Sequence, residues 1–106
     1  MSLADEKSHP IAAGEQPLPG DEAKTLARDV PGWTLVDGRI EEDLRFADFG
    51  QAIEFVNRVA GVAAREDHHP DILISYNRVR LILSTHKIGG LSRNDFIVAA
   101  KIDRLL

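Results

Sequence analysis

Three of the four histidines of this 106-residue chain lie within a short stretch, from His68 to His86. His68 and His69 are adjacent and precede Pro70, whereas His86 ends a run of alternating apolar and polar residues. Imidazole titrates near neutral pH, so two or three imidazoles in one pocket can divide the work of a general acid and a general base. The pattern therefore predicts proton-transfer chemistry, provided that the fold brings His86 to the His68–His69 pair.

Other interpretations of these residues stay open at this point. The polar turn from Asp67 to Asp71 is also compatible with a loop that only faces solvent. A zinc site would combine the imidazoles with a neighbouring carboxylate, but adjacent histidines rarely point at one ion and no His-Glu-x-x-His spacing is present. A serine nucleophile is disfavoured because Ser75 and Ser84 lack the Gly-x-Ser-x-Gly motif. We therefore expect acid–base chemistry without a metal.

The elements that position the histidines follow from the apolar periodicity. Residues 48–65 have apolar side chains at spacings of three and four, which predicts an amphipathic helix, and Pro70 places the histidine pair on the turn after it. Its predicted apolar stripe consists of Phe49, Ala52, Ile53, Val56, Val59, Ala60 and Ala63. Residues 72–76 and 79–86 are predicted strands of a hairpin, with a turn at Asn77-Arg78. Since a hairpin returns its second strand to the start of its first, we expect His86 near His68 and His69.

The remaining elements complete an α+β fold. A short helix is expected over 21–30 with Asp21 as N-cap, followed by strands over 33–36 and 39–46 around the turn Asp37-Gly38. Ser92 and Asp95 are spaced as the N-cap and N3 residues of a final helix that runs to about Leu105. This order predicts a four-stranded antiparallel sheet with helices packed on one face, whose exposed edges would pair across subunits.

Composition and charge limit the other classes. Residues 1–20 contain three prolines and two glycines without apolar periodicity, which predicts a flexible N-terminal tail before a single domain over 21–106. Thirteen basic and seventeen acidic residues give a net charge of −4, which argues against direct binding of nucleic acid. The chain has no cysteine, and its apolar runs are far shorter than the roughly 18 residues of a membrane span. We expect a cytoplasmic protein.

A resemblance to a known family rests on four spaced motifs. They are Asp67-His68-His69-Pro70-Asp71, Tyr76-Asn77-Arg78-Val79, Leu83-Ser84-Thr85-His86, and Gly90-Leu91-Ser92 with Asp95. The combination resembles pterin-4a-carbinolamine dehydratase, also called 4a-hydroxytetrahydrobiopterin dehydratase, over about residues 21–106. The resemblance implies an α+β fold, a pterin substrate, no cofactor, and homodimers that join sheets edge to edge and in some members pair into tetramers.

The resemblance also implies roles for individual residues. His68, His69 and His86 match the three active-site histidines, with Pro70 in the same motif. Trp33 matches a tryptophan that lines the pterin pocket, although a buried core position would explain it equally well. Asp95 matches an acidic residue near His86, and its N3 position also predicts a capping role. The implied reaction is the dehydration of pterin-4a-carbinolamine to quinonoid dihydropterin in tetrahydrobiopterin recycling, which would make the protein a hydro-lyase.

One position departs from the family pattern. Family members commonly have a glutamate four residues before the first histidine of the pair, and this position is Ala64 here. Glu66 lies on a different side of the helix and is not a simple replacement. Relatives with this fold also act as dimerisation or assembly modules without catalysis. A second alternative is a protein that binds another pterin.

Overall fold

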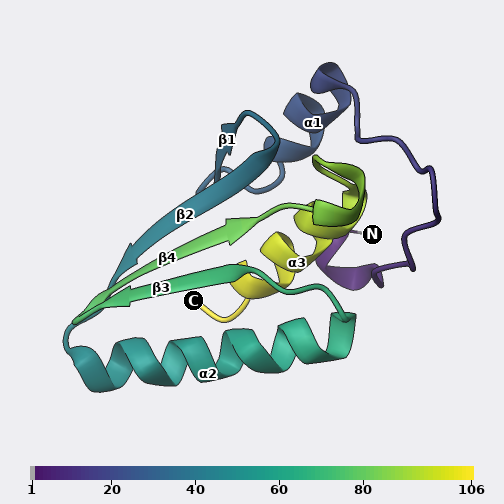
Figure 1. Ribbon diagram of the computed structural model, residues 1–106. Coiled ribbons are helices and arrows are strands. Elements are labelled where there is room, and N and C mark those ends of the chain that lie inside the picture. The colour runs from purple at the N-terminus through teal and green to yellow at the C-terminus, as the bar shows by residue number, and fades with distance from the viewer. Residues whose placement is uncertain (1) are drawn as a thin grey trace.

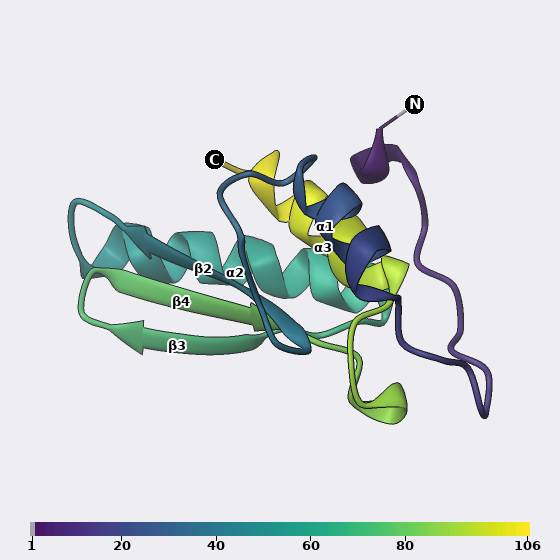
Figure 2. The ribbon, with the colours of Figure 1, turned by 90° about the horizontal axis from the view of Figure 1, so that it is seen from above.

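The computed structural model describes residues 2–106, which form one antiparallel sheet covered on one face by helices (Figure 1). The sheet contains β1 (Thr34–Val36), β2 (Arg39–Arg45), β3 (Asp71–Ser75) and β4 (Arg78–Leu83) in the order β1-β2-β4-β3. The helices are α1 (Gly20–Ala27), α2 (Phe49–Glu66) and α3 (Arg93–Asp103), and Figure 2 shows α2 and α3 behind the same side of the sheet. The predicted fold class is confirmed.

The core lies between the sheet and the helices. Alternate residues of β4 point inward, so Val79, Leu81 and Leu83 are buried while Arg78 and Arg80 are exposed. In β2, Ile40 is buried opposite Leu83 and Phe96 of α3 is fully buried in the same apolar cluster. The sheet and α3 therefore share one continuous core.

The buried face of α2 is rotated from the predicted stripe. Its buried residues are Ala52, Phe55, Val59, Val62, Ala63 and Glu66. Phe49 is half exposed and Ala60 is exposed, because α2 contacts both β4 and α3 and its buried face is the one directed toward these two elements. Phe55 packs on Phe46 with the ring centroids 5.0 Å apart.

Within residues 2–106, no helix is both long enough and apolar enough to cross a bilayer.

Several boundaries differ from the sequence expectation. Helix α1 begins at Gly20 with Pro19, not Asp21, in the N-cap position, and it ends at Ala27 instead of Val30. The turn between β3 and β4 is Tyr76-Asn77, one residue earlier than predicted, with Tyr76 at a positive φ of 53°. Strand β4 ends at Leu83, and His86 begins a 3-10 helix over His86–Ile88, because Thr85 and Gly90 pair and close a loop.

Residues 2–18, here called the N-terminal strap, run along the body of the molecule. Leu3 is buried in the core cluster, and the ion pairs Glu6–Arg93 and Asp5–Arg104 tie the strap to α3 and its C-terminal end. Further along, the backbone N–H of Leu18 donates to the carbonyl of Leu91. The sequence predicts a tail here because polar and proline-rich residues show no periodicity, and these contacts depend on partners far away in the chain. Its flexibility stays a prediction, and Met1 lies outside the described residues.

Candidate active site

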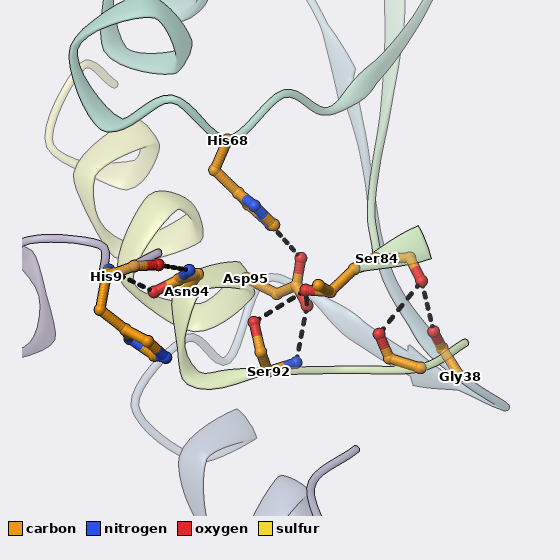
Figure 3. Close-up of polar contacts among 9 residues, drawn as sticks. His9, Gly38, His68, Ser84, Ser92, Asn94 and Asp95 are labelled. Atoms are coloured by element: carbon orange, nitrogen blue, oxygen red, sulfur yellow. Dashed lines mark hydrogen bonds and ion pairs between the residues drawn. The ribbon is translucent and has the colours of Figure 1, made fainter. Parts of the chain in front are cut away.

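His68 is positioned by the way α2 ends. Asp67 adopts the left-handed conformation, with φ 49° and ψ 43°, and terminates the helix after Glu66. The backbone N–H of His68 then donates to the carbonyl of Ala63, as in a helix-terminating Schellman motif. The predicted turn after the helix is therefore observed, and it directs the His68 side chain toward the N-terminal end of α3 (Figure 3).

The His68 imidazole contacts a buried carboxylate. Its Nε2 lies 2.5 Å from Oδ1 of Asp95, and the two side chains are 11% and 0% exposed. An ionised carboxylate only accepts hydrogen bonds, so opposite an ionised Asp95 the Nε2 atom of His68 is the donor. This arrangement leaves Nδ1 of a neutral His68 with the lone pair, free to accept a proton from another group.

The orientation of the Asp95 carboxylate is set by its other oxygen. Oδ2 accepts a hydrogen bond from the Thr85 hydroxyl at 2.8 Å. It also accepts one from the Ser92 backbone N–H at 2.9 Å (Figure 3). The hydroxyls of Thr85 and Ser92 also lie 2.7 Å apart. A buried carboxylate needs such partners, because removal from water otherwise disfavours its charge. Asp95 thus caps α3 through its N3 position, as predicted, while Oδ1 faces His68.

His86 is linked to the Asp95 carboxylate through the preceding residue, Thr85. Thr85 binds Asp95, and His86 follows it at the start of the 3-10 helix. His86 and His69 are both exposed, whereas His68 is mostly buried. The fold therefore places His86 directly after a residue that contacts Asp95, with its side chain open to solvent, and its approach to His68 stays a prediction. Pro70 is half-buried at the entry to β3.

Trp33 lies in the core, away from the Asp95 end of α3. It is 4% exposed, and its indole Nε1–H donates to Oδ1 of Asp103 at 3.0 Å. Asp103 is eight residues beyond Asp95 on α3, which corresponds to about 12 Å along the helix axis. The structure thus gives Trp33 a packing role, and its contact with a pterin stays a prediction. Ala64 is exposed near the end of α2.

A second carboxyl group lies in the core beside Trp33. Glu42 on β2 is 6% exposed, its Oε1 atom has no hydrogen-bond partner, and its side chain closely approaches Gly32. Burial, with a smaller contribution from Asp103, raises the pKa of Glu42 to about 7. Burial also raises the pKa of Asp103, although the hydrogen bond from Trp33 opposes this shift. Neither group lies among the candidate site residues.

Sequence reasoning identified Ser92 as the N-cap of α3, but it did not identify Thr85 and Glu42 as polar groups that matter inside the fold. The alternation of β4 placed Thr85 on the same face as Leu81 and Leu83, and a hydroxyl on a buried face requires a partner. Glu42 interrupted the apolar face of β2 in the same way. Thr85 and Glu42 could therefore have been recognised as polar residues on strand faces that are otherwise apolar. Among residues 2–106, no three His, Asp or Glu side chains group as metal ligands would.

The chain is similar in sequence to proteins of one family. A sequence model of the family described as Pterin 4 alpha carbinolamine dehydratase matches residues 16–105. A protein from Nitrosomonas eutropha named "Putative pterin-4-alpha-carbinolamine dehydratase" is 49% identical over 98% of this chain and 93% of its own length. A protein of the same name from Rubrobacter xylanophilus is 44% identical over 97% of both chains.

A solved structure has the same fold. The crystal structure of a transcriptional coactivator/pterin dehydratase from Brucella melitensis superposes with a TM-score of 0.80 and 32% sequence identity. The similarity covers 85% of this chain and 98% of that one.

Proposed function

Because the chain belongs to the pterin-4-alpha-carbinolamine dehydratase family, we propose that it is a hydro-lyase that dehydrates pterin-4a-carbinolamine to quinonoid dihydropterin. The observation that carries the proposal is the His68–Asp95 hydrogen bond, because it gives one histidine of the family motif a defined orientation and proton arrangement. The family membership supplies the substrate class, and the side chains of this chain supply the acid and base groups.

The reaction requires two proton transfers. The substrate has a hydroxyl on the ring carbon next to an amine nitrogen. The C–O bond breaks as a general acid protonates the departing hydroxyl, and a general base removes the nitrogen proton. The nitrogen electron pair then forms a C=N double bond, and water leaves. Each positioned acid or base group contributes about 10²–10⁴-fold to such a reaction.

We assign the two transfers to His68 and His86. Neutral His68 with its proton on Nε2 has its lone pair on Nδ1 and suits the base, since Asp95 stabilises the positive charge that it acquires. His86 lies on the loop after Thr85, is open to solvent, and would protonate the hydroxyl. In this proposal His69 and Pro70 hold the pterin ring from the turn before β3. Trp33 occupies the position of the tryptophan that lines the pterin pocket in the family, and in this proposal it supports the pocket from the core.

We further propose that the protein acts in the recycling of tetrahydrobiopterin in the cytoplasm. Quinonoid dihydropterin is the form that a reductase converts back to the tetrahydropterin consumed by aromatic amino-acid hydroxylation. This assignment follows from the product of the proposed reaction and from the family name of the relatives.

The edge of the sheet supports a homodimer. Strand β3 pairs on one side only, with β4, and its Leu73 is 52% exposed. An open edge strand with apolar residues is prone to pair with a second chain. We therefore propose that two copies join through β3, and that pairs of dimers form a tetramer.

The test of the proposed function is the dehydration of freshly generated 4a-hydroxytetrahydropterin, followed by ultraviolet absorbance. The full-length protein is expected to accelerate the reaction well above the uncatalysed rate in the same buffer. A folded protein that leaves the rate unchanged would contradict the proposal.

A second candidate function is a docking module without catalysis. Two observations favour it. The chain has Ala64 where the family commonly has glutamate, and the similar Brucella protein is described as a transcriptional coactivator as well as a dehydratase. Titration with a stable pterin, monitored by the fluorescence of Trp33 or by calorimetry, separates the possibilities. Binding without turnover indicates a protein for another pterin, and no binding indicates the docking module.

A further inference from the structure

We infer that the N-terminal strap positions the His68–Asp95 pair by tying the end of α2 to the start of α3. The tie consists of the backbone N–H groups of two consecutive strap residues, Ser8 and His9. The inference rests on the proposed function in one respect only, namely that His68 is its acid–base residue. Ser8, His9 and their partners are positioning residues, because they act on His68 and Asp95 through the two helices.

The first bond holds the end of α2. The Ser8 N–H donates to Oε1 of Glu66 at 2.8 Å, and Glu66 is the last residue of the helix. The other oxygen of Glu66 lies 3.7 Å from Nζ of Lys101 on α3. Glu66 is buried, which alone would raise its pKa, but the Ser8 N–H and Lys101 outweigh this effect and the pKa lies below its ordinary value. The Glu66 carboxylate is therefore a charged anchor between the strap and both helices.

The second bond holds the start of α3. The His9 N–H donates to Oδ1 of Asn94 at 3.0 Å, and the Asn94 side-chain NH₂ donates back to the His9 carbonyl at 2.7 Å (Figure 3). Asn94 is 2% exposed, so its amide has no free access to water. The Asn94 amide thus uses both its oxygen and its NH₂ group on the backbone of a single residue. Because these buried groups have no alternative partner in water, the two hydrogen bonds fix the position of His9.

These anchors lie beside the catalytic pair in sequence. Glu66 is two residues before His68, and Asn94 directly precedes Asp95. Since Ser8 and His9 are consecutive residues, only the Cα and carbonyl carbon of Ser8 separate their two backbone nitrogens, so the two N–H groups cannot move far apart. The strap therefore sets how far the end of α2 lies from the start of α3, and this separation determines the His68–Asp95 contact.

Other contacts of the strap hold Ser8 and His9 in place. Glu6 makes two 2.7 Å hydrogen bonds with Arg93, and Lys87 Nζ donates to the carbonyl of Ile11 at 2.8 Å. Contacts on both sides of Ser8 and His9 thus limit their movement. Residues 2–15 of the strap, which include Ser8 and His9, precede the region matched by the family model. The Nitrosomonas eutropha relative aligns over 98% of the chain, which includes most of the strap.

The test removes the two N–H groups one at a time in the full-length protein. His9→Pro and Ser8→Pro each delete one backbone donor, whereas His9→Ala and Ser8→Ala delete the same side chains and keep the donors. Asn94→Ala breaks the His9 link from the α3 side and leaves the strap backbone intact. It provides a variant that does not depend on proline being accommodated.

The main measurement is the imidazole ¹⁵N chemical shifts of His68, observed by long-range ¹H–¹⁵N correlation. The alanine controls are expected to match the wild type, and His9→Pro, Ser8→Pro and Asn94→Ala are expected to shift His68 toward the values of the exposed His69 and His86. If dehydratase activity is present, kcat falls about ten- to a hundredfold in these three variants with little change in KM, because small displacements of reacting groups have effects of this size.

The possible outcomes decide the inference independently of the enzyme assay. His68 shifts that stay at the wild-type values in the folded proline variants and in Asn94→Ala overturn it. Equal changes in the alanine controls also overturn it, since they would assign the effect to side chains. If the protein has no dehydratase activity, the chemical shifts still establish or reject the positioning role.

Discussion

The Nε2 atom of His68 lies 2.5 Å from the Oδ1 atom of Asp95, although 27 residues separate them in the chain. The carboxylate has no exposed surface, and its Oδ2 atom is occupied by Thr85 and Ser92. Only Oδ1 is free to face the imidazole. This relationship links the end of α2 to the N3 position of α3 and determines which nitrogen of His68 is available to a substrate.

Replacing Asp95 with asparagine tests the importance of this proton arrangement. In Asp95→Asn the amide oxygen can still accept from Thr85 and Ser92, but the amide NH₂ then faces His68. The imidazole must accept at Nε2 and carry its proton on Nδ1, which is the opposite tautomer. We expect kcat for dehydration to fall by about 10²–10⁴-fold. Asp103→Asn, which changes another buried carboxyl of α3, serves as the control, and equal rates in the two variants would contradict the assignment.

Replacing Glu42 with glutamine tests the effect of a buried carboxyl on stability. The pKa of Glu42 is raised to about 7 from an ordinary 4.5, so the unfolded chain loses this proton more readily than the folded protein. The contribution of Glu42 to stability is fully present below about pH 4.5 and is lost as the pH rises through about 7. At about 1.4 kcal/mol for each pKa unit, the loss is about 3 kcal/mol.

The measurement is urea unfolding at pH 5 and pH 8. We expect the free energy of unfolding of Glu42→Gln to change less between the two pH values than that of the wild type. Glu41→Gln is the matched control, because Glu41 is the next residue of β2, is half-buried, and forms an ion pair with Arg39. Identical pH dependence in Glu42→Gln and the wild type would refute the effect.

Several of these features could be predicted from the sequence, and others could not. The alternation of Val79, Leu81 and Leu83 and the Ser92–Asp95 spacing are local patterns, so they predicted the buried face of β4 and the start of α3 correctly, although β4 ends three residues earlier than predicted. The bond between Ser8 and Glu66 spans 58 residues and has no local signal. The buried face of α2 also depended on the position of α3, which periodicity does not describe. Local patterns placed His68 and His69 on the turn after α2, but they assigned His86 to the strand instead of the 3-10 helix that follows it. Long-range packing determined which of the histidines is buried.

Restoring the family glutamate tests the departure at residue 64. Position 64 is exposed, so Ala64→Glu is expected to change the free energy of unfolding by less than about 0.5 kcal/mol. If the family glutamate contacts the pterin or a histidine, kcat/KM for dehydration should rise. Ala60→Glu, also exposed and one turn earlier on α2, controls for the added charge. A kcat/KM that is equal in both variants would show that residue 64 has no role in the site.

A lysine on the edge strand tests self-association through β3. Leu73→Lys places a charge on the open edge, where burial between two strands would be costly, and the protein is expected to become monomeric. Leu106→Lys makes the same change at another exposed leucine, away from the sheet. The molar masses are compared by light scattering during gel filtration. A Leu73→Lys protein with the mass of the wild-type oligomer would exclude this interface.

The role of His68 is tested by comparing the dehydration rate constants of the wild type and His68→Gln at neutral pH. Glutamine retains a side-chain amide that can donate to Asp95 but cannot act as an acid or a base at this pH. We expect strong acceleration by the wild type and a decrease of about 10²–10⁴-fold in His68→Gln, with the fold unchanged by circular dichroism. A His68→Gln protein that dehydrates the carbinolamine as fast as the wild type would contradict the claim that His68 carries the proton transfer.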